Sequence, residues 1–202
     1  MSNVKELFNG DGCKESLPLL QIAGEIAESI GIEAYVVGGF VRDLLMGKPL
    51  NDIDIMVVGD GINFAKHVSK ALGIHKVVPF EKFGTALIPS QPIQIEIASA
   101  RTESYDNHSR KPKQVIYTDL KGDLVRRDFT INAMAVDIRP NHFGNLYDPF
   151  EGIQDLHAKR LITPLDPNET FSEDPLRMMR GAYFASKLSF EIDDECLNSI
   201  KR

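Results

Sequence analysis

The chain has 202 residues, 43% of them hydrophobic, and a formal net charge of −6. That length and composition suffice for a full hydrophobic core and fit one α/β domain followed by the start of another. The acidic balance excludes binding of nucleic acid through overall charge, because proteins that bind in this way have basic surfaces. Any nucleic-acid contact must come from a local patch or from parts of the protein outside this sequence.

The cysteines and the apolar runs give no sign of export or of a membrane. Cys13 and Cys196 stand near opposite ends of the chain without a metal-binding spacing, which favours free thiols in a reducing compartment. No apolar run reaches the roughly 18 residues that a membrane span needs, and residues 1–16 lack the features of a targeting signal. We expect a soluble cytoplasmic protein with no membrane partner.

The first third of the chain alternates helical and strand-like patterns. Apolar spacing predicts these elements in chain order: a helix over 17–30, a strand over 35–37, a short helix over 41–46, a strand over 53–58 and a helix over 63–72. Gly31 and Gly73 end the two longer helices in the position where glycine commonly follows a helix.

The middle of the chain predicts a hairpin, a strand and a loop. Residues 75–89 are typical of two short strands in a hairpin. Residues 92–101 alternate apolar and polar side chains, which predicts a half-buried strand with Glu96 on its polar face. Residues 102–123 are polar and charged, which predicts a long loop of the kind that is often functional.

The last part of the chain is mostly helical. Residues 124–138 predict a helix that runs into a strand, and residues 146–164 predict a turn and a short helix. Residues 172–188 predict a helix whose start is marked by Asp174 as N-cap and a proline after it, and residues 193–202 predict the first turns of another. The fold class is therefore α/β (α+β), with a head that contains a small mixed sheet and a helical neck.

Three parts follow from this pattern. We expect a helical lead-in over 1–34, the head over 35–148, and a connector with the start of the neck over 149–202. Because the sequence stops inside a predicted helix, we also expect it to be a truncated piece of a longer protein.

Two carboxylates stand where the strand over 53–58 begins. Asp52 and Asp54 are two residues apart, so their side chains leave the same face of a strand. Like charges this close repel unless a cation lies between them, and Mg²⁺ is the natural partner because it takes oxygen ligands and leaves room for phosphate. Glu96 is the candidate third carboxylate. In the alternative interpretation, Asp52 caps a turn and Asp54 is solvated on an edge strand.

A glycine pair precedes these acids. Gly38 and Gly39 lie between a predicted strand and a predicted helix, where backbone N–H groups can approach a phosphate, and Arg42 one turn later could reach the same anion. The alternative is an ordinary turn that needs a positive φ. The glycine pair, an Arg-Asp pair and D-x-D within seventeen residues favour phosphate binding.

These motifs stand in an order that resembles a known family. "GGFVRDLLMGKPLNDIDI" resembles the signature of the DNA polymerase beta-like nucleotidyltransferases, in particular the bacterial-type (class II) tRNA CCA-adding enzymes and the bacterial poly(A) polymerases. "IEIASARTESY" is similar to the family's third-carboxylate strand, "RRDFTINAMAVDI" to a further motif, and "EDPLRMMRGAYFASKL" to its nucleotide-selecting helix. The resemblance covers roughly residues 35–188.

The resemblance implies a reaction and its residues. The 3′-hydroxyl of an RNA, in the first place a tRNA, attacks the α-phosphate of ATP or CTP without a template, and pyrophosphate leaves. Asp52 and Asp54 would bind metal ions, Mg²⁺ in a two-ion site or Mn²⁺ in its place, with Glu96 assisting. The implied nucleotide-binding residues are Gly38, Gly39, Arg42, Arg126, Arg127, Asp128 and Asn132.

The resemblance also assigns base selection to Asp174 and Arg177. A carboxylate accepts from the exocyclic amino groups of C and A, and arginine supplies complementary donors, which would favour ATP and CTP over GTP and UTP. Arg180 would add a contact on the same helix face. In the structural alternative, Asp174 caps the helix and Arg177 pairs with Glu173; the two roles are compatible.

The resemblance leaves the loop and the product open. Residues 102–120 correspond to the family's flexible loop, whose charged residues could help to choose C or A: Arg101, Glu103, Asp106, Arg110 and Lys111. "PFEKFGTALI" lacks the basic pair associated with the poly(A) branch, which favours CCA addition. The alternatives are poly(A) addition, addition of A or CC alone, and a nucleotide-binding fragment without RNA activity of its own, since most tRNA contacts are expected in regions beyond the neck.

Overall fold

The computed structural model describes residues 2–104 and 114–201. Within them, seven strands form one sheet in the order β3-β4-β5-β2-β1-β8-β9. Their bounds are β1 Glu33–Val37, β2 Asp52–Val58, β3 Val78–Phe80, β4 Thr85–Ile88, β5 Gln94–Ser99, β8 Ala135–Asp137 and β9 Leu146–Tyr147. The central neighbours β2 and β5 run parallel and the other pairs antiparallel, so the expected mixed sheet is confirmed.

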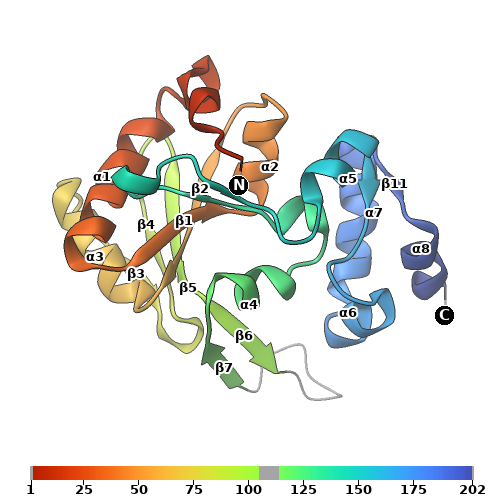
Figure 1. Cartoon of the computed structure of the whole chain (residues 1–202). Helices are drawn as coiled ribbons and strands as arrows, with labels where there is room; N and C mark the ends of the chain where they lie inside the picture. Colours follow the sequence, from red (N-terminus) through yellow and green to blue (C-terminus); the bar gives the residue numbers. More distant parts are fainter. Residues whose placement is uncertain (1, 105–113, 202) are drawn as a thin grey trace.

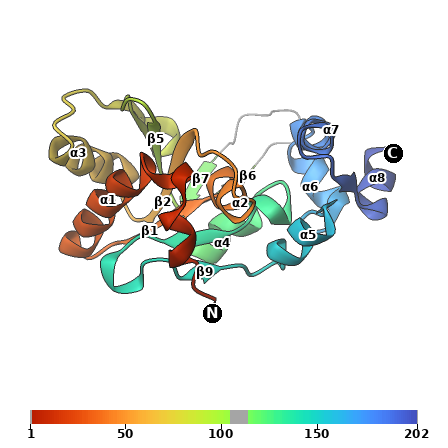
Figure 2. The same ribbon diagram turned by 90° about the horizontal axis from the view of Figure 1, so that it is seen from above.

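Helices α1 (Ser16–Ile30), α2 (Gly39–Leu45) and α3 (Gly61–Ala71) pack on one face of the sheet (Figures 1 and 2). The period of two along β2 decides this arrangement. Ile53 and Ile55 are buried in the core that these helices share, whereas Asp54 leaves the opposite face, which α4 (Leu120–Val125) partly covers. The helix over 17–30 therefore belongs to the same core as the strands of the head.

The neck lies beside the sheet and is drawn in colours from teal (α5) to blue (α8) in Figure 1. It consists of α5 Gly152–Ala158, α6 Pro167–Glu173, α7 Leu176–Leu188 and α8 Asp194–Ile200, with two short parallel strands, β10 Arg160–Leu161 and β11 Glu191–Ile192. A second apolar cluster joins it to the head, because Phe129 and Ile131 of the head pack with Phe184 and Leu188 of α7.

The segments outside the sheet correct two sequence expectations. Residues 102–123 were expected to form a loop, but both ends of this segment have regular structure. β6 (Arg101–Ser104) pairs antiparallel with β7 (Gln114–Tyr117), and α4 begins at Leu120. The helix expected over 124–138 lies earlier, as α4, and is followed by a 3₁₀ turn at Thr130–Asn132.

The helix expected over 172–188, with Asp174 and a proline marking its start, is confirmed as α7, which begins at Leu176. The sequence did not predict α6, which ends at Glu173 just before it. Asp174 between them has an extended backbone, because a residue that precedes proline disfavours the helical region. Further 3₁₀ turns lie at Lys5–Asn9, Asp11–Cys13, Glu81–Phe83 and Pro140–His142.

Two further expectations concern the thiols and the membrane. Cys13 and Cys196 are both free thiols, as expected, and the structure shows that both are buried. In the described part of the chain, none of the helices combines the length and the apolar character that crossing a membrane requires.

Candidate active site

A cleft of about 580 Å³ lies between the head and α7 and gathers most of the predicted site residues. Of the predicted catalytic and nucleotide-binding residues, Asp52 and Glu96 lie outside the lining, and these belong to it: Gly38, Gly39, Arg42, Asp54, Arg126, Arg127, Asp128, Asn132, Asp174, Arg177 and Arg180. Arg101, predicted as a charged residue of the loop, lines it as well. Sequence reasoning did not place four more residues there: Leu176, Tyr183, Phe184 and Lys187.

The cleft is a local basic patch on an acidic chain. Seven cationic side chains line it: Arg42, Arg101, Arg126, Arg127, Arg177, Arg180 and Lys187. The acidic residues of the lining are Asp54, Asp128 and Asp174. Clefts lined by one sign of charge concentrate ligands of the opposite sign, so the cleft favours a polyanion even though the net charge of the chain is −6.

The three carboxylates lie on the two parallel central strands. Asp54 on β2 is the register partner of Glu96 on β5, and Asp52 is the partner of Gln94. Burial, the charge of Glu96 and the charge of Asp52 raise the pKa of Asp54 to about 6, against the opposing effect of Arg127. The negative charge around Asp54 therefore exceeds what the protein itself compensates, which is the electrostatic condition for a bound cation.

The carboxylates fit an open metal site better than a closed one. Among the described residues, no group of three or more His, Cys, Asp or Glu residues is arranged to hold a metal ion. The expectation that Glu96 is the third carboxylate therefore stays a prediction, and Glu96 lies opposite Asp54 in the strand register. Mg²⁺ commonly binds through one or two carboxylates and takes its other ligands from water and substrate phosphates, so Asp52 and Asp54 fit such an ion.

Gly38 shapes the turn between β1 and α2. Its φ of 66° and ψ of −130° lie outside the region that residues with a side chain adopt. A Cβ at this position would stand 2.7 Å from Nη1 of Arg127. The Gly38 N–H donates to the carbonyl of Met134 at 3.3 Å, so this amide is already paired. Gly38 therefore gives Arg127 room to approach the turn.

Arg42 lines the cleft but is only 4% exposed, and three neighbouring side chains hold its guanidinium. Its Nη1 donates to Oδ1 of Asn132 at 2.8 Å, and Nε and Nη2 donate to the two oxygens of Asp43 at 2.9 Å each. Its Cζ lies 5.2 Å from the ring centroid of Phe184. The Cζ of Arg180 lies 5.1 Å from the same ring centroid. The ring of Phe184 therefore orients two arginines, Arg42 of the head and Arg180 of the neck.

Asp128 links the ribose- and base-binding candidates. It is 6% exposed, and its Oδ1 accepts from Phe129 N at 2.8 Å and from Asn132 Nδ2 at 3.0 Å. Its Oδ2 accepts from Arg180 Nε at 2.6 Å. One carboxylate thus connects the head motif to α7.

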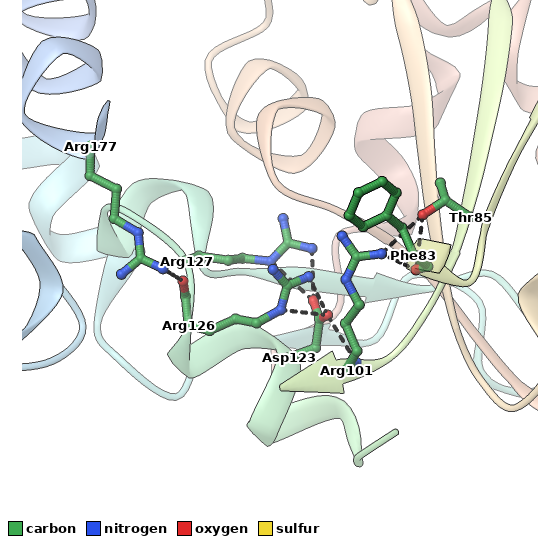
Figure 3. A network of polar contacts seen from close by, with 7 residues as sticks. All are labelled: Phe83, Thr85, Arg101, Asp123, Arg126, Arg127 and Arg177. Atoms are coloured by element: carbon green, nitrogen blue, oxygen red, sulfur yellow. Dashed lines mark hydrogen bonds and ion pairs between the residues drawn. The ribbon is translucent and has the colours of Figure 1, made fainter. Parts of the chain in front are cut away.

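Figure 3 shows a network that sequence reasoning missed, centred on Asp123 of α4. Its carboxylate accepts from Arg126 Nη2 and from Arg127 Nη2 at 2.9 Å each, and from the backbone N–H of Arg101 at 3.3 Å. Burial alone would raise the pKa of Asp123, but the guanidinium groups of Arg127 and Arg126 outweigh burial and hold it below its ordinary value. Its sequence signal is the spacing of three residues to Arg126 and of four to Arg127, which brings charged side chains together on a helix.

Asp174 and Arg177 make the contacts of the structural alternative. Asp174 lies before α7 rather than on its face, and its Oδ1 accepts from the Leu176 N–H at 3.0 Å. Arg177 is 7% exposed and donates to the carbonyls of Thr170 (3.1 Å) and Arg126 (2.8 Å) and to Glu173 (3.2 Å). Both residues nevertheless line the cleft, so the structural contacts also fix them there.

The loop residues divide into two groups. Arg101 lines the cleft, and its Nη1 donates to the carbonyl of Phe83 and to Oγ1 of Thr85 (Figure 3). The predictions for Asp106, Arg110 and Lys111, and for the side chain of Glu103, lie outside the described residues.

Comparison with known proteins agrees with this arrangement. Residues 34–162 match the family described as the poly A polymerase head domain. The chain is 36% identical over 197 residues to an A-adding tRNA nucleotidyltransferase of Halalkalibacterium halodurans (97% of this chain, 45% of the relative). It is 40% identical over 188 residues to a CCA-adding enzyme of Enterococcus faecalis (93% of this chain, 43% of the relative).

A solved structure of a CCA-adding enzyme with CTP superposes with a TM-score of 0.84 at 34% identity, over 99% of this chain and 44% of that one. The chain spans less than half the length of the curated relatives that it matches. It covers 45% of the Halalkalibacterium halodurans enzyme, 19% of the Aquifex aeolicus enzyme and 22% of the Geobacter sulfurreducens enzyme.

Proposed function

From its membership of the poly A polymerase head-domain family, to which the chain belongs, we propose that it is the catalytic head of an enzyme that adds nucleotides from ATP and CTP to the 3′ end of tRNA. The observation that carries the proposal is the cleft, in which seven cationic side chains converge in front of the strand pair that carries Asp54 and Glu96. The similarity to A-adding and CCA-adding enzymes supports tRNA as the acceptor.

In this proposal the RNA 3′-hydroxyl attacks the α-phosphate and pyrophosphate leaves. Arg126 and Arg127 bind phosphate oxygens, because guanidinium groups offer paired donors that match them, and Arg42 completes the phosphate contacts. Asp128 and Asn132 bind the ribose. The proposal keeps residues 35–148 as the head and 149–202 as connector and early neck.

Asp52 and Asp54 would hold a divalent cation, Mg²⁺ in the first place, with Glu96 beside Asp54. Bound there, the cation would supply positive charge at the phosphate oxygens. The site is open on the side of the cleft that Asp54 lines, so the triphosphate itself can provide the remaining oxygen ligands.

Calorimetric titration of the chain with ATP, CTP, GTP and UTP, each with Mg²⁺ and with EDTA, tests this reading of the cleft. We expect ATP and CTP to bind in the presence of Mg²⁺ and more tightly than GTP and UTP. Asp54→Asn should remove the Mg²⁺ dependence. Equal binding of all four nucleotides would contradict base selection by this head, and the absence of any nucleotide binding would contradict the proposed function.

Two activities are candidates for the number of nucleotides that the enzyme adds to the tRNA. The sequence favours complete CCA addition, whereas the similarity to A-adding relatives favours addition of the terminal A alone. Two tRNA transcripts separate them, one that lacks CCA and one that ends in CC. Addition of A to the second transcript alone supports the A-adding activity, and extension of both supports CCA addition. We expect low efficiency because most tRNA contacts are proposed to lie in regions that the longer relatives carry beyond this span.

A further inference from the structure

Asp123 is the most completely buried charged group next to the cleft, at 1% exposure among the described residues. It does not line the cleft. Each of its oxygens accepts two hydrogen bonds from one guanidinium: Oδ1 from Arg126 (Nε 3.2 Å, Nη2 2.9 Å) and Oδ2 from Arg127 (Nε 3.3 Å, Nη2 2.9 Å). One buried carboxylate therefore holds two neighbouring arginines that do line the cleft (Figure 3).

This arrangement solves a problem that the Arg126–Arg127 pair creates. Two adjacent guanidinium groups repel each other, and each side chain has a large rotamer entropy that must be lost before it can hold a phosphate. A shared buried carboxylate removes most of the repulsion and fixes both side chains in advance. Binding groups that are ordered before the ligand arrives bind more tightly, because the ordering cost does not fall on the binding step.

The position of Arg127 shows in which direction Asp123 holds its guanidinium. Its Nη1 packs against Gly38, where a Cβ would stand only 2.7 Å away. The Arg127 nitrogen that Asp123 does not bind is thus directed toward the glycine turn. On the other side, Asp123 accepts from the Arg101 N–H at 3.3 Å, which anchors it to the first residue of β6.

We propose that Asp123 is a positioning residue, which orders Arg126 and Arg127 for binding the triphosphate without touching the nucleotide itself. The proposal rests on the proposed function only in naming the nucleotide. Because Asp123 acts on the phosphate contacts, it affects ATP and CTP equally and leaves base preference unchanged.

Tripolyphosphate, which has no base or sugar, is the direct probe. Calorimetric titration at low ionic strength in EDTA compares the wild-type chain with Asp123→Asn, which keeps the size of the side chain and removes its charge. We expect affinity for tripolyphosphate to fall about tenfold, the order expected when two side chains must be fixed during binding. KM for ATP and for CTP should rise by the same factor, while the ratio between the nucleotides stays constant.

Asp137→Asn is the matched control. Asp137 is also fully buried and pairs with Arg139 at 2.6 Å, but neither residue lines the cleft. We expect it to lower stability and leave tripolyphosphate affinity unchanged. Equal weakening by both variants would reduce Asp123 to a structural residue and overturn the proposal.

A mutant cycle supplies the decisive readout. If Asp123 acts through the arginines, Asp123→Asn should have no further effect on tripolyphosphate affinity in a chain that already carries Arg126→Ala and Arg127→Ala. An undiminished effect there overturns the proposal. Should Asp123→Asn fail to fold, Asp123→Glu takes its place, because moving the carboxylate by one methylene displaces both guanidinium groups; a folded Asp123→Glu chain with wild-type tripolyphosphate affinity would also overturn it.

The proposed function and this proposal fail differently. In one outcome, the wild-type chain binds tripolyphosphate, Asp123→Asn weakens this binding, and the wild-type chain transfers no nucleotide. That result contradicts the proposed function and supports the positioning role. A wild-type chain that binds tripolyphosphate and is indifferent to Asp123→Asn overturns the positioning role and leaves the function intact.

Discussion

The Nε of Arg180 lies 2.6 Å from Oδ2 of Asp128, an ion pair between α7 and the head whose partners are 52 residues apart in sequence. The two partners are not equivalent, because Asp128 is almost fully buried whereas the side chain of Arg180 is 49% exposed. Removing either one should therefore have different consequences.

We expect Asp128→Ala to lower the free energy of unfolding by about 1–3 kcal/mol, since it leaves the donors of Asn132 and Phe129 without their acceptor. Arg180→Ala should cost less than about 1 kcal/mol, because the side chain is half exposed and Asp128 keeps its other two donors. Urea denaturation of both variants measures the difference. Equal losses would mean that the ion pair, rather than the buried hydrogen bonds, carries the stability.

Asp174 combines a capping contact with a place in the cleft, and the two can be separated. Asp174→Ser keeps an oxygen that can accept from the Leu176 N–H but removes the carboxylate. We expect stability within about 1 kcal/mol of wild type and a loss of the preference for ATP and CTP over GTP and UTP, measured by calorimetry.

Asp60→Ser is the control for the cap alone. Asp60 caps α3 by accepting from the Asn63 N–H at 2.9 Å and lies outside the cleft. It should leave nucleotide preference unchanged. If Asp174→Ser also retains the preference, Asp174 is a helix cap and no more.

Gly38 and Gly31 both have a positive φ, of 66° and 70°, but differ in what surrounds them. A Cβ at Gly31 meets nothing within 4 Å, whereas one at Gly38 meets Arg127. We expect Gly31→Ala to lose about 1–2 kcal/mol of stability, because Gly31 has a left-handed backbone. Gly38→Ala should lose more, because its ψ of −130° lies outside that region, and it alone should weaken ATP binding. Thermal unfolding and calorimetry on the same samples test this, and weakened binding in Gly31→Ala would show that strain alone suffices.

The pKa of Asp123 predicts a pH dependence of stability with a definite sign. A carboxyl whose pKa is lower in the folded chain than in the unfolded one stabilises the fold at pH values above its unfolded pKa of about 4. That stabilisation is lost as the pH falls through the folded value. Asp123→Asn should therefore be less stable than wild type at pH 7, with a difference that shrinks below about pH 4.

Urea midpoints of the two proteins between neutral and acidic pH measure the predicted difference. Asp137→Asn, measured in parallel, shows how much another buried aspartate contributes to the stability against urea at each pH. A difference between wild type and Asp123→Asn that stays constant down to the acid limit would show that the carboxylate is not held in its charged form by the arginines.

The sequence by itself determined which face of which strand carries the acids. Alternation of apolar residues with Asp52 and Asp54 requires only the period of two of an extended backbone, a local property that no tertiary contact needs to supply. The same holds for the glycine turn at Gly38 and for the helix over 17–30. The order of the motifs then indicated the family, and with it most of the residues that line the cleft.

Only the tertiary structure decided which partners hold those residues. Arg42 meets Asn132 across 90 positions, and Asp128 meets Arg180 across 52. No local pattern specifies such pairs, because they depend on how the head and α7 pack around Phe129 and Phe184. The spacing of Asp123 to Arg126 and Arg127 is visible in the sequence, but its burial is a property of the folded chain.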